Sequence, residues 1–205
     1  MSGTGNRRDL RAIRRPKHAE VRRQRRGFSV IELIVVMIMM GIIAGMAVPR
    51  LNYDRYRADG AMRVVRTVLQ GAQRNAIMRQ TDVVVAIDET TNQLKILEDV
   101  NNNCMKDAGE RLSVRPLEDG AKFHKPPVPW TGTSPSTAIL GTNLCVLNGL
   151  PAVQFLRDGA ASSDVDVYVT SARGRTIDYR MIRVTMASGR SESFRYNGSA
   201  WVRFN

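Results

Sequence analysis

Residues 28–48 form an apolar run that carries a single charged side chain, Glu32. In a helix, which rises about 1.5 Å per residue, this run measures about 31 Å, close to the hydrocarbon thickness of a bilayer. The pattern therefore predicts a transmembrane helix. A cleavable secretory signal has a shorter apolar core and a small-residue cleavage site, which the following stretch "GMAVPR" matches poorly. A lasting membrane anchor is favoured, with removal by signal peptidase as the alternative.

The next segment, residues 58–77, changes to a one-sided helical period. Its apolar positions are Ala58, Ala61, Met62, Val65, Val68, Leu69, Ala72, Ala76 and Ile77. This spacing predicts an amphipathic helix whose apolar face needs a sheet or another helix. Pro49 lies between the two segments and should kink their junction, because it removes a helical hydrogen bond. We expect one kinked helix from residue 28 to about residue 79.

Beyond the helix, the apolar positions follow the period of strands. "DVVVAID" and "QLKILED" flank a polar turn and predict a β-hairpin, and "RLSVRPL" is a further strand candidate. Residues 99–150 are otherwise irregular, and short alternating strands follow from residue 151 to the end, with Asn197-Gly198 as the strongest hairpin turn. The pattern predicts an α+β fold in which a long N-terminal helix packs on an antiparallel β-sheet, residues 49–205 forming the globular domain.

The positive charge is concentrated before the apolar run. The formal net charge is +12, and residues 1–27 hold nine arginines and Lys17 against Asp9 and Glu20, a net charge of +8. This segment is polar and poor in aromatic residues, so it predicts a disordered basic leader. By the positive-inside rule the leader stays in the cytoplasm and the domain after residue 48 crosses the membrane.

Two cysteines, Cys104 and Cys145, lie in the part expected to be exported. In an oxidising compartment such a pair usually forms a disulfide, and two free thiols are the alternative. The only histidines are His18 and His124, which makes a metal site unexpected. Asp164 and Asp166 alternate along a predicted strand and are expected to be solvated rather than to hold a cation. We expect no metal and no cofactor.

The stretch "GFSVIE", residues 27–32, together with the apolar run behind it, resembles the signature of type IV pilin-like proteins. The resemblance implies that a prepilin peptidase cuts between Gly27 and Phe28 and methylates the new amine of Phe28. Glu32 then lies one helical turn from that amine. A carboxylate inside a bilayer is costly and usually has a partner. In a filament Glu32 can pair with the amine of a neighbouring subunit, and a carboxylate that reaches the headgroups without an assembly role is the alternative.

The exported part resembles the GspH/FimT group of minor pilins and pseudopilins. The shared features are the kinked amphipathic helix, the hairpin, a variable loop, and two short motifs, F-x-x-x-G at Phe155–Gly159 and G-R at Gly189-Arg190. The resemblance implies a subunit of the inner membrane with a periplasmic domain. It assembles with other pilins through its N-terminal helix, in a type IV pilus or a type II secretion pseudopilus, and primes or caps the filament.

Two further classes of function compete with this one. Residues 173–205 carry a net charge of +5, and Arg173, Arg175 and Arg190 lie beside predicted turns, so a FimT-like DNA-binding surface for DNA uptake is the alternative. Its aromatic residues could instead point into the core, which would leave a solvated sheet face. An enzyme is not expected, because the chain has no G-x-S-x-G, Walker A or H-E-x-x-H motif.

Overall fold

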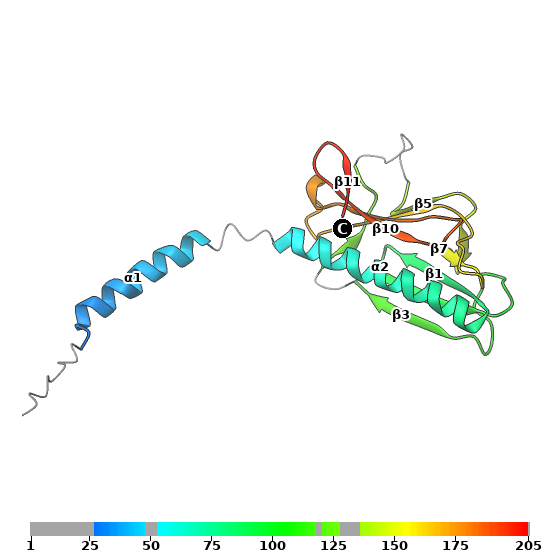
Figure 1. The fold of residues 1–205 in the computed structure, drawn as a ribbon, viewed down its shortest axis with the longest axis horizontal. Coiled ribbons are helices and arrows are strands. Elements are labelled where there is room, and N and C mark those ends of the chain that lie inside the picture. The colour runs from blue at the N-terminus through cyan, green and yellow to red at the C-terminus, as the bar shows by residue number, and fades with distance from the viewer. Residues whose placement is uncertain (1–26, 48–52, 118–119, 128–135, 205) are drawn as a thin grey trace, which may run out of the picture. The chain divides into compact units, whose positions relative to one another are not determined.

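The computed structural model describes residues 27–47, 53–117, 120–127 and 136–204. The chain divides into two units, Met1–Arg50 and Leu51–Asn205, which are described separately. The basic leader up to residue 26 and the predicted kink at Pro49 lie outside the described residues. Figure 1 shows the elements of both units.

The first unit contains helix α1, Val30–Ala47. The side chain of Ser29 begins it by accepting a hydrogen bond from the backbone N–H of Ile31 at 3.3 Å, as residues at this position commonly do. Glu32 lies in the first turn, where the helix dipole favours a negative charge. Within the described ranges, no helix combines the length and the hydropathy needed to cross a membrane.

The second unit begins with helix α2, Tyr53–Arg79, and confirms the predicted amphipathic pattern. Seven of the nine predicted apolar positions are buried: Ala58, Ala61, Met62, Val65, Leu69, Ala72 and Ala76. Val68 is partly buried against the same core. The prediction for Ile77 was wrong, because this residue, near the end of the helix, is 44% exposed and lies outside the core.

The strands form two antiparallel sheets rather than one. The first has the order β3-β2-β1-β7-β6, and the second the order β11-β10-β9-β8-β4, with β5 also paired to β8. The strands of the first sheet are β1 (Asp82–Asp88), β2 (Gln93–Asp99), β3 (Leu112–Pro116), β6 (Cys145–Leu147) and β7 (Leu150–Phe155). Those of the second are β4 (Lys122–Phe123), β5 (Ile139–Gly141), β8 (Val165–Thr170), β9 (Arg180–Val184), β10 (Ser191–Tyr196) and β11 (Trp201–Arg203), with a short 3₁₀-helix η2 (Thr176–Asp178) before β9.

The hairpin of β1 and β2 has the predicted bounds, and strands were expected wherever β3 and β7 to β11 lie. β4, β5 and β6 were missed, because each is only two or three residues long and falls in the stretch that looked irregular. The prediction of a single sheet is corrected to two sheets, because the successive strands β7 and β8 pair in different sheets. The short strands occupy edges of the sheets and are held by pairing with long neighbours.

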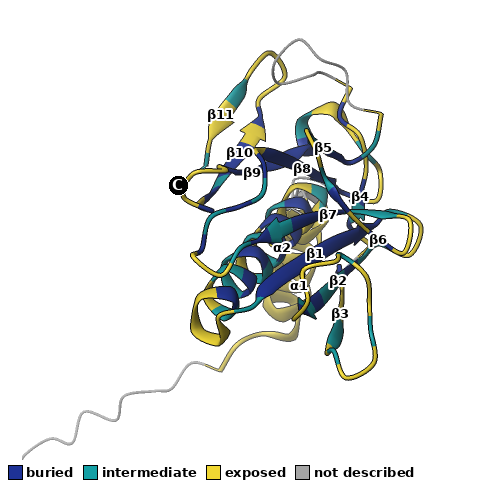
Figure 2. Ribbon diagram, turned by 90° about the vertical axis from the view of Figure 1, so that its right-hand side faces the viewer, coloured by how far each residue is buried: buried dark blue, intermediate teal, exposed yellow. Residues whose placement is uncertain are grey.

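The main core lies between α2 and both sheets. Valines of β1, β7 and β8 meet the apolar face of α2 there, together with Phe155 and Ile182. β1 is buried along its whole length, because its other face packs in a second cluster that contains Leu97, Cys145 and Leu147. Figure 2 shows β1 and β8 as buried strands and an exposed outer face on α2.

Candidate functional site

The predicted processing site lies at the start of the described chain. Phe28 is 81% exposed, and no described atom lies within 4 Å of the place where a side chain on Gly27 would begin. A protease that needs an extended, unobstructed peptide would therefore meet no steric hindrance from the described part of this unit.

Helix α1 is exposed on every side in its own unit, as each described side chain from residue 28 to residue 45 shows. A helix that is apolar all round is normally surrounded by lipid or by other helices. Glu32 is the only carboxylate of this helix. It lies one turn after Phe28, so the new amine and this carboxylate would share the same end of the helix.

The two short C-terminal motifs meet each other at α2. The side-chain amide of Gln73 donates hydrogen bonds of 2.8 Å to the carbonyl of Gly159 and of 2.8 Å to the carbonyl of Ser188. Gly159 and Gly189 both have positive φ angles, of 89° and 60°. The F-x-x-x-G and G-R motifs thus build a structural junction between α2 and two turns that lie far apart in the sequence.

The structure does not bring Arg173, Arg175 and Arg190 together. Arg173 forms an ion pair of 3.4 Å with Asp54, in the first turn of α2, and Arg175 precedes η2. Arg190 follows Gly189, which adjoins Gln73. Nineteen residues of helix separate Asp54 from Gln73, so the two groups of arginines are about 28 Å apart along α2.

Other C-terminal arginines are neutralised. Arg180 is buried and pairs with Asp59 of α2 while also donating to the carbonyls of Ile177 and Tyr179. Arg203 pairs with Glu192 at 2.7 Å. These pairs hold the second sheet together and against α2, and they reduce the charge offered to a ligand.

The aromatic residues near these arginines belong to the core. Tyr179, Phe194 and Tyr196 are buried, and Trp201 packs against Tyr196 in a tilted arrangement with ring centroids 5.4 Å apart. Burial raises the pKa of the Tyr179 hydroxyl. These aromatic side chains therefore do not offer a surface on which bases could stack. This agrees with the alternative in which the arginines lie on a solvated sheet face and the aromatic residues point into the core.

Asp164 and Asp166 are engaged by the protein itself. Both oxygens of Asp166 accept hydrogen bonds of 2.7 Å from the guanidinium of Arg183, and Asp164 accepts one of 2.7 Å from the backbone N–H of Met186. In the described ranges no three or more His, Cys, Asp or Glu side chains gather in a way that could hold a metal ion.

The predicted disulfide is present. Cys104 and Cys145 are bonded, with their Cα atoms 6.0 Å apart and 41 positions apart in the sequence. Cys104 lies in the connection between β2 and β3, and Cys145 begins β6 at the far edge of the same sheet. The bond therefore holds this connection over the second face of the sheet, next to Leu112 and Leu150.

Comparisons with known proteins agree with the motif at the N-terminus. The profile described as the prokaryotic N-terminal methylation motif matches residues 22–48. Residues 22–48 therefore carry a prokaryotic N-terminal methylation motif. The chain is also 30% identical over 97 residues to the pilin-like protein PilA1 of Thermus thermophilus, an alignment that spans 47% of this chain and 62% of that pilin-like relative. The match supports the predicted processing motif at the N-terminus, and the chain resembles this pilin-like relative over part of its length.

Two solved structures align with part of this chain. The minor pseudopilin EpsH of the Vibrio cholerae type 2 secretion system aligns with a TM-score of 0.47 and 14% identity, over 70% of this chain and 99% of that one. The type IV minor pilin FimU of Pseudomonas aeruginosa aligns with a TM-score of 0.47 and 12% identity, over 72% of this chain and 94% of that one.

Proposed function

We propose that this protein is a minor pilin or pseudopilin of the GspH/FimT group that assembles into a type IV pilus or a type II secretion pseudopilus. The observation that carries the proposal is the methylation motif over residues 22–48, with "GFSVIE" at its centre. A prepilin peptidase cuts after Gly27 and methylates Phe28. The apolar segment then anchors the chain in the inner membrane, and the domain after it lies in the periplasm.

Assembly in this proposal depends on Glu32. The amine of a processed Phe28 on one subunit pairs with the carboxylate of Glu32 on its neighbour, which offsets the cost of burying either charge and fixes the register of the helices. Gly41 and Gly45, both in α1, have the spacing that permits close helix contact. The subunit adds at an end of the filament, where it primes or caps the assembly.

Mass spectrometry of the protein from cells that contain a prepilin peptidase tests the processing step. The expected N-terminus is methylated Phe28. An intact Met1, or a cut near Ala47 instead, would contradict the proposal, because either result would leave residues 22–48 acting as an ordinary anchor or signal.

Replacement of Glu32 tests the assembly step. We expect Glu32→Ala to insert in the membrane normally, since the segment becomes more apolar, and to be lost from purified filaments. Met37→Ala, which truncates an exposed apolar side chain of the same helix, is the matched control and should remain in filaments. Equal incorporation of the two variants would show that the pairing with Glu32 is not needed.

DNA binding through Arg173, Arg175 and Arg190 stays a prediction and is the second candidate function. In its favour, all three lie on the surface next to turns, and Arg175 and Arg190 form no ion pair with the described residues. Against it stands their separation along α2. A FimT-like surface would bind duplex DNA with an affinity that falls steeply with salt, because phosphate contacts release counterions. The triple replacement by Gln should then abolish binding. No binding by the unmodified protein at low salt would remove this candidate.

A further inference from the structure

A small cavity lies between the start of α2 and the strands β9 and β10. It has a volume of about 270 Å³, and one arginine from each of these elements lines it, namely Arg55, Arg180 and Arg195. Asp59 is the only acidic residue among the described residues of the lining, which therefore carries three positive charges against one negative, a net charge of +2. An excess of positive charge on the walls of a cavity favours the binding of an anion.

Arg180 supplies the buried wall of this cavity. Its side chain is 4% exposed, its Nε donates to the carboxylate of Asp59, and its Nη1 donates 3.0 Å hydrogen bonds to the backbone carbonyls of Ile177 and Tyr179. The third nitrogen, Nη2, donates to no described group. Because an unsatisfied buried donor costs free energy, this nitrogen indicates an acceptor that the described part of the chain does not supply.

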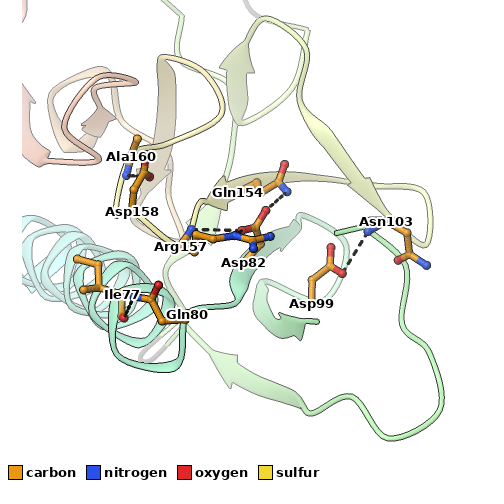
Figure 3. Close-up of polar contacts among 9 residues, drawn as sticks. All are labelled: Ile77, Gln80, Asp82, Asp99, Asn103, Gln154, Arg157, Asp158 and Ala160. Carbon is orange, nitrogen blue, oxygen red and sulfur yellow. Dashed lines mark hydrogen bonds and ion pairs between the residues drawn. The ribbon is translucent and has the colours of Figure 1, made fainter. Parts of the chain in front are cut away.

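A buried carboxylate of the other sheet shows the usual arrangement. Asp82 is 3% exposed, and one of its oxygens accepts a hydrogen bond from the side-chain amide of Gln154 at 3.0 Å. The other oxygen accepts one from the backbone N–H of Arg157 at 3.2 Å (Figure 3). Both oxygens of this buried group thus have partners within the chain. Arg180 departs from this arrangement with an unused donor, and it lines a cavity that a ligand can enter.

The other two arginines of the cavity also have charge to offer. Arg195 lies directly opposite Arg180 on the neighbouring strand, and like charges in such a pair destabilise a sheet. Asp59 balances only one of them. Arg55 and Arg195 form no ion pair with any described residue. The side-chain nitrogen of Asn197, whose oxygen caps the hairpin turn, likewise donates to no described group. An anion in the cavity would therefore meet donors from four side chains.

The position of the cavity along the chain indicates which anion is at hand. Tyr53 begins α2 five residues after Val48, the last residue of the apolar run, and five residues of extended chain reach at most about 18 Å. Tyr53 and Tyr56, on the first turn of α2, are 58% and 71% exposed. Exposed tyrosines are enriched at the level of lipid headgroups, where the apolar ring and the polar hydroxyl both find suitable surroundings. The anions at that level are the phosphates of phospholipids.

We propose that the cavity binds the phosphate group of a membrane phospholipid and thereby holds the start of α2 at the membrane surface. This inference rests on the proposed function, which anchors residues 28–48 in the bilayer. The phosphate accepts hydrogen bonds from Nη2 of Arg180 and from the side chains of Arg55 and Arg195. Such charge-assisted bonds are stronger than neutral ones, and the planar guanidinium fits phosphate oxygens. The bound anion also offsets the repulsion between Arg180 and Arg195.

Native mass spectrometry of the full-length protein in a neutral detergent tests the proposal. Phosphatidylglycerol is the probe, and diacylglycerol, which has the same acyl chains but no phosphate, is the matched lipid. We expect one phosphatidylglycerol to stay bound to each protein molecule and diacylglycerol to be retained at least about tenfold less, because the bonds to the arginines supply the affinity. Equal retention of both lipids would overturn the proposal, since the acyl chains alone would then explain the binding.

Two competitors identify the source of the phosphate. Neither inorganic phosphate nor a short duplex DNA should displace the lipid, because neither has acyl chains that stay beside an apolar helix. Displacement by inorganic phosphate at about 1 mM would assign the cavity to free phosphate. Displacement by the DNA would assign the arginines to nucleic acid. Either result overturns the proposal.

Two double variants locate the site. Arg55→Gln combined with Arg195→Gln removes two charges from the cavity and leaves the buried Arg180 in place, so retention of phosphatidylglycerol should fall at least about tenfold while the unfolding midpoint is kept. Arg63→Gln combined with Arg74→Gln makes the same change of charge at two exposed positions of α2 outside the cavity, and it should retain the lipid as the unmodified protein does. Equal retention by the two double variants overturns the proposal.

Membrane extraction and the mass of the N-terminus separate this outcome from a failure of the proposed function. A chain that lacks methylated Phe28, or that leaves the membrane without detergent, counts against the proposed function. A chain that is methylated at Phe28 and needs detergent for extraction, yet shows no preference for phosphatidylglycerol, overturns the phospholipid site alone.

Discussion

The junction of Gly159, Gly189 and Gln73 leads to a sharp prediction about stability. If Gly189 is replaced by alanine, the new Cβ lies 2.1 Å from the carbonyl oxygen of Gly159 and 2.6 Å from the side-chain nitrogen of Gln73. The Gln73 amide can turn away, whereas the carbonyl is part of the backbone and is fixed by the turn. The backbone of one turn must therefore move.

The expected loss in the free energy of unfolding has two parts. Holding alanine at a φ of 60° costs roughly 1–2 kcal/mol, because its Cβ crowds the backbone in the left-handed region. Forcing an extra methyl group into a filled site costs about 1–3 kcal/mol more. We expect Gly189→Ala to lower the free energy of unfolding by about 2–5 kcal/mol, a large fraction of the 5–15 kcal/mol that is typical of folded domains.

Gly149→Ala is the matched control. Gly149 has a φ of 80°, but no atom lies within 4 Å of its added Cβ, so only the conformational part applies. Chemical denaturation of both full-length variants in detergent, followed by near-ultraviolet circular dichroism, measures the difference. Gly189→Ala should be less stable than Gly149→Ala by about 1–3 kcal/mol. Equal stabilities would refute the reasoning, because they would mean that the close approach to Gly159 is not a rigid feature of the fold.

Three further results are expected. Asp59→Ala leaves the buried guanidinium of Arg180 without its carboxylate, so the free energy of unfolding should fall by about 2–4 kcal/mol. Thermal or denaturant unfolding measures this change, and an unchanged stability would show that the pair does not hold α2 to β9. Cys145→Ser removes the disulfide to Cys104 and should lower the free energy of unfolding by about 3–4 kcal/mol in the same measurement, because the disulfide closes a long loop. An unchanged unfolding midpoint would mean that the connection between β2 and β3 is ordered without the disulfide. The hydrogen bond from the ammonium of Lys95, together with that from the backbone N–H of Thr91, lowers the pKa of Asp88 from 3.8 to about 2. The stability that this carboxylate contributes is therefore present above about pH 4 and is lost as the pH falls through 2. Asp88→Asn should lower the free energy of unfolding by about 1–2 kcal/mol at pH 7 and by progressively less below pH 4, and a difference that does not change with pH in the same measurement would contradict this reasoning.

The local elements could be predicted from the sequence because each depends on neighbouring residues. The 3.6-residue period from residue 58 to residue 76 determined the buried face of α2, and the alternation around a polar turn determined the hairpin of β1 and β2. The N-terminal motif could also be recognised from the sequence, because "GFSVIE" and the apolar run that follows it are contiguous.

Only the tertiary structure decided how these elements combine. The pairing of β1 with β7 joins segments some 70 residues apart, and the division into two sheets arises because the successive strands β7 and β8 pair in different sheets. The separation of Arg173 from Arg190 likewise follows from where two turns meet α2. The three residues Cys145–Leu147 are too few to show a strand period by themselves. They form a strand because a longer neighbour supplies their hydrogen bonds and a disulfide holds them in place.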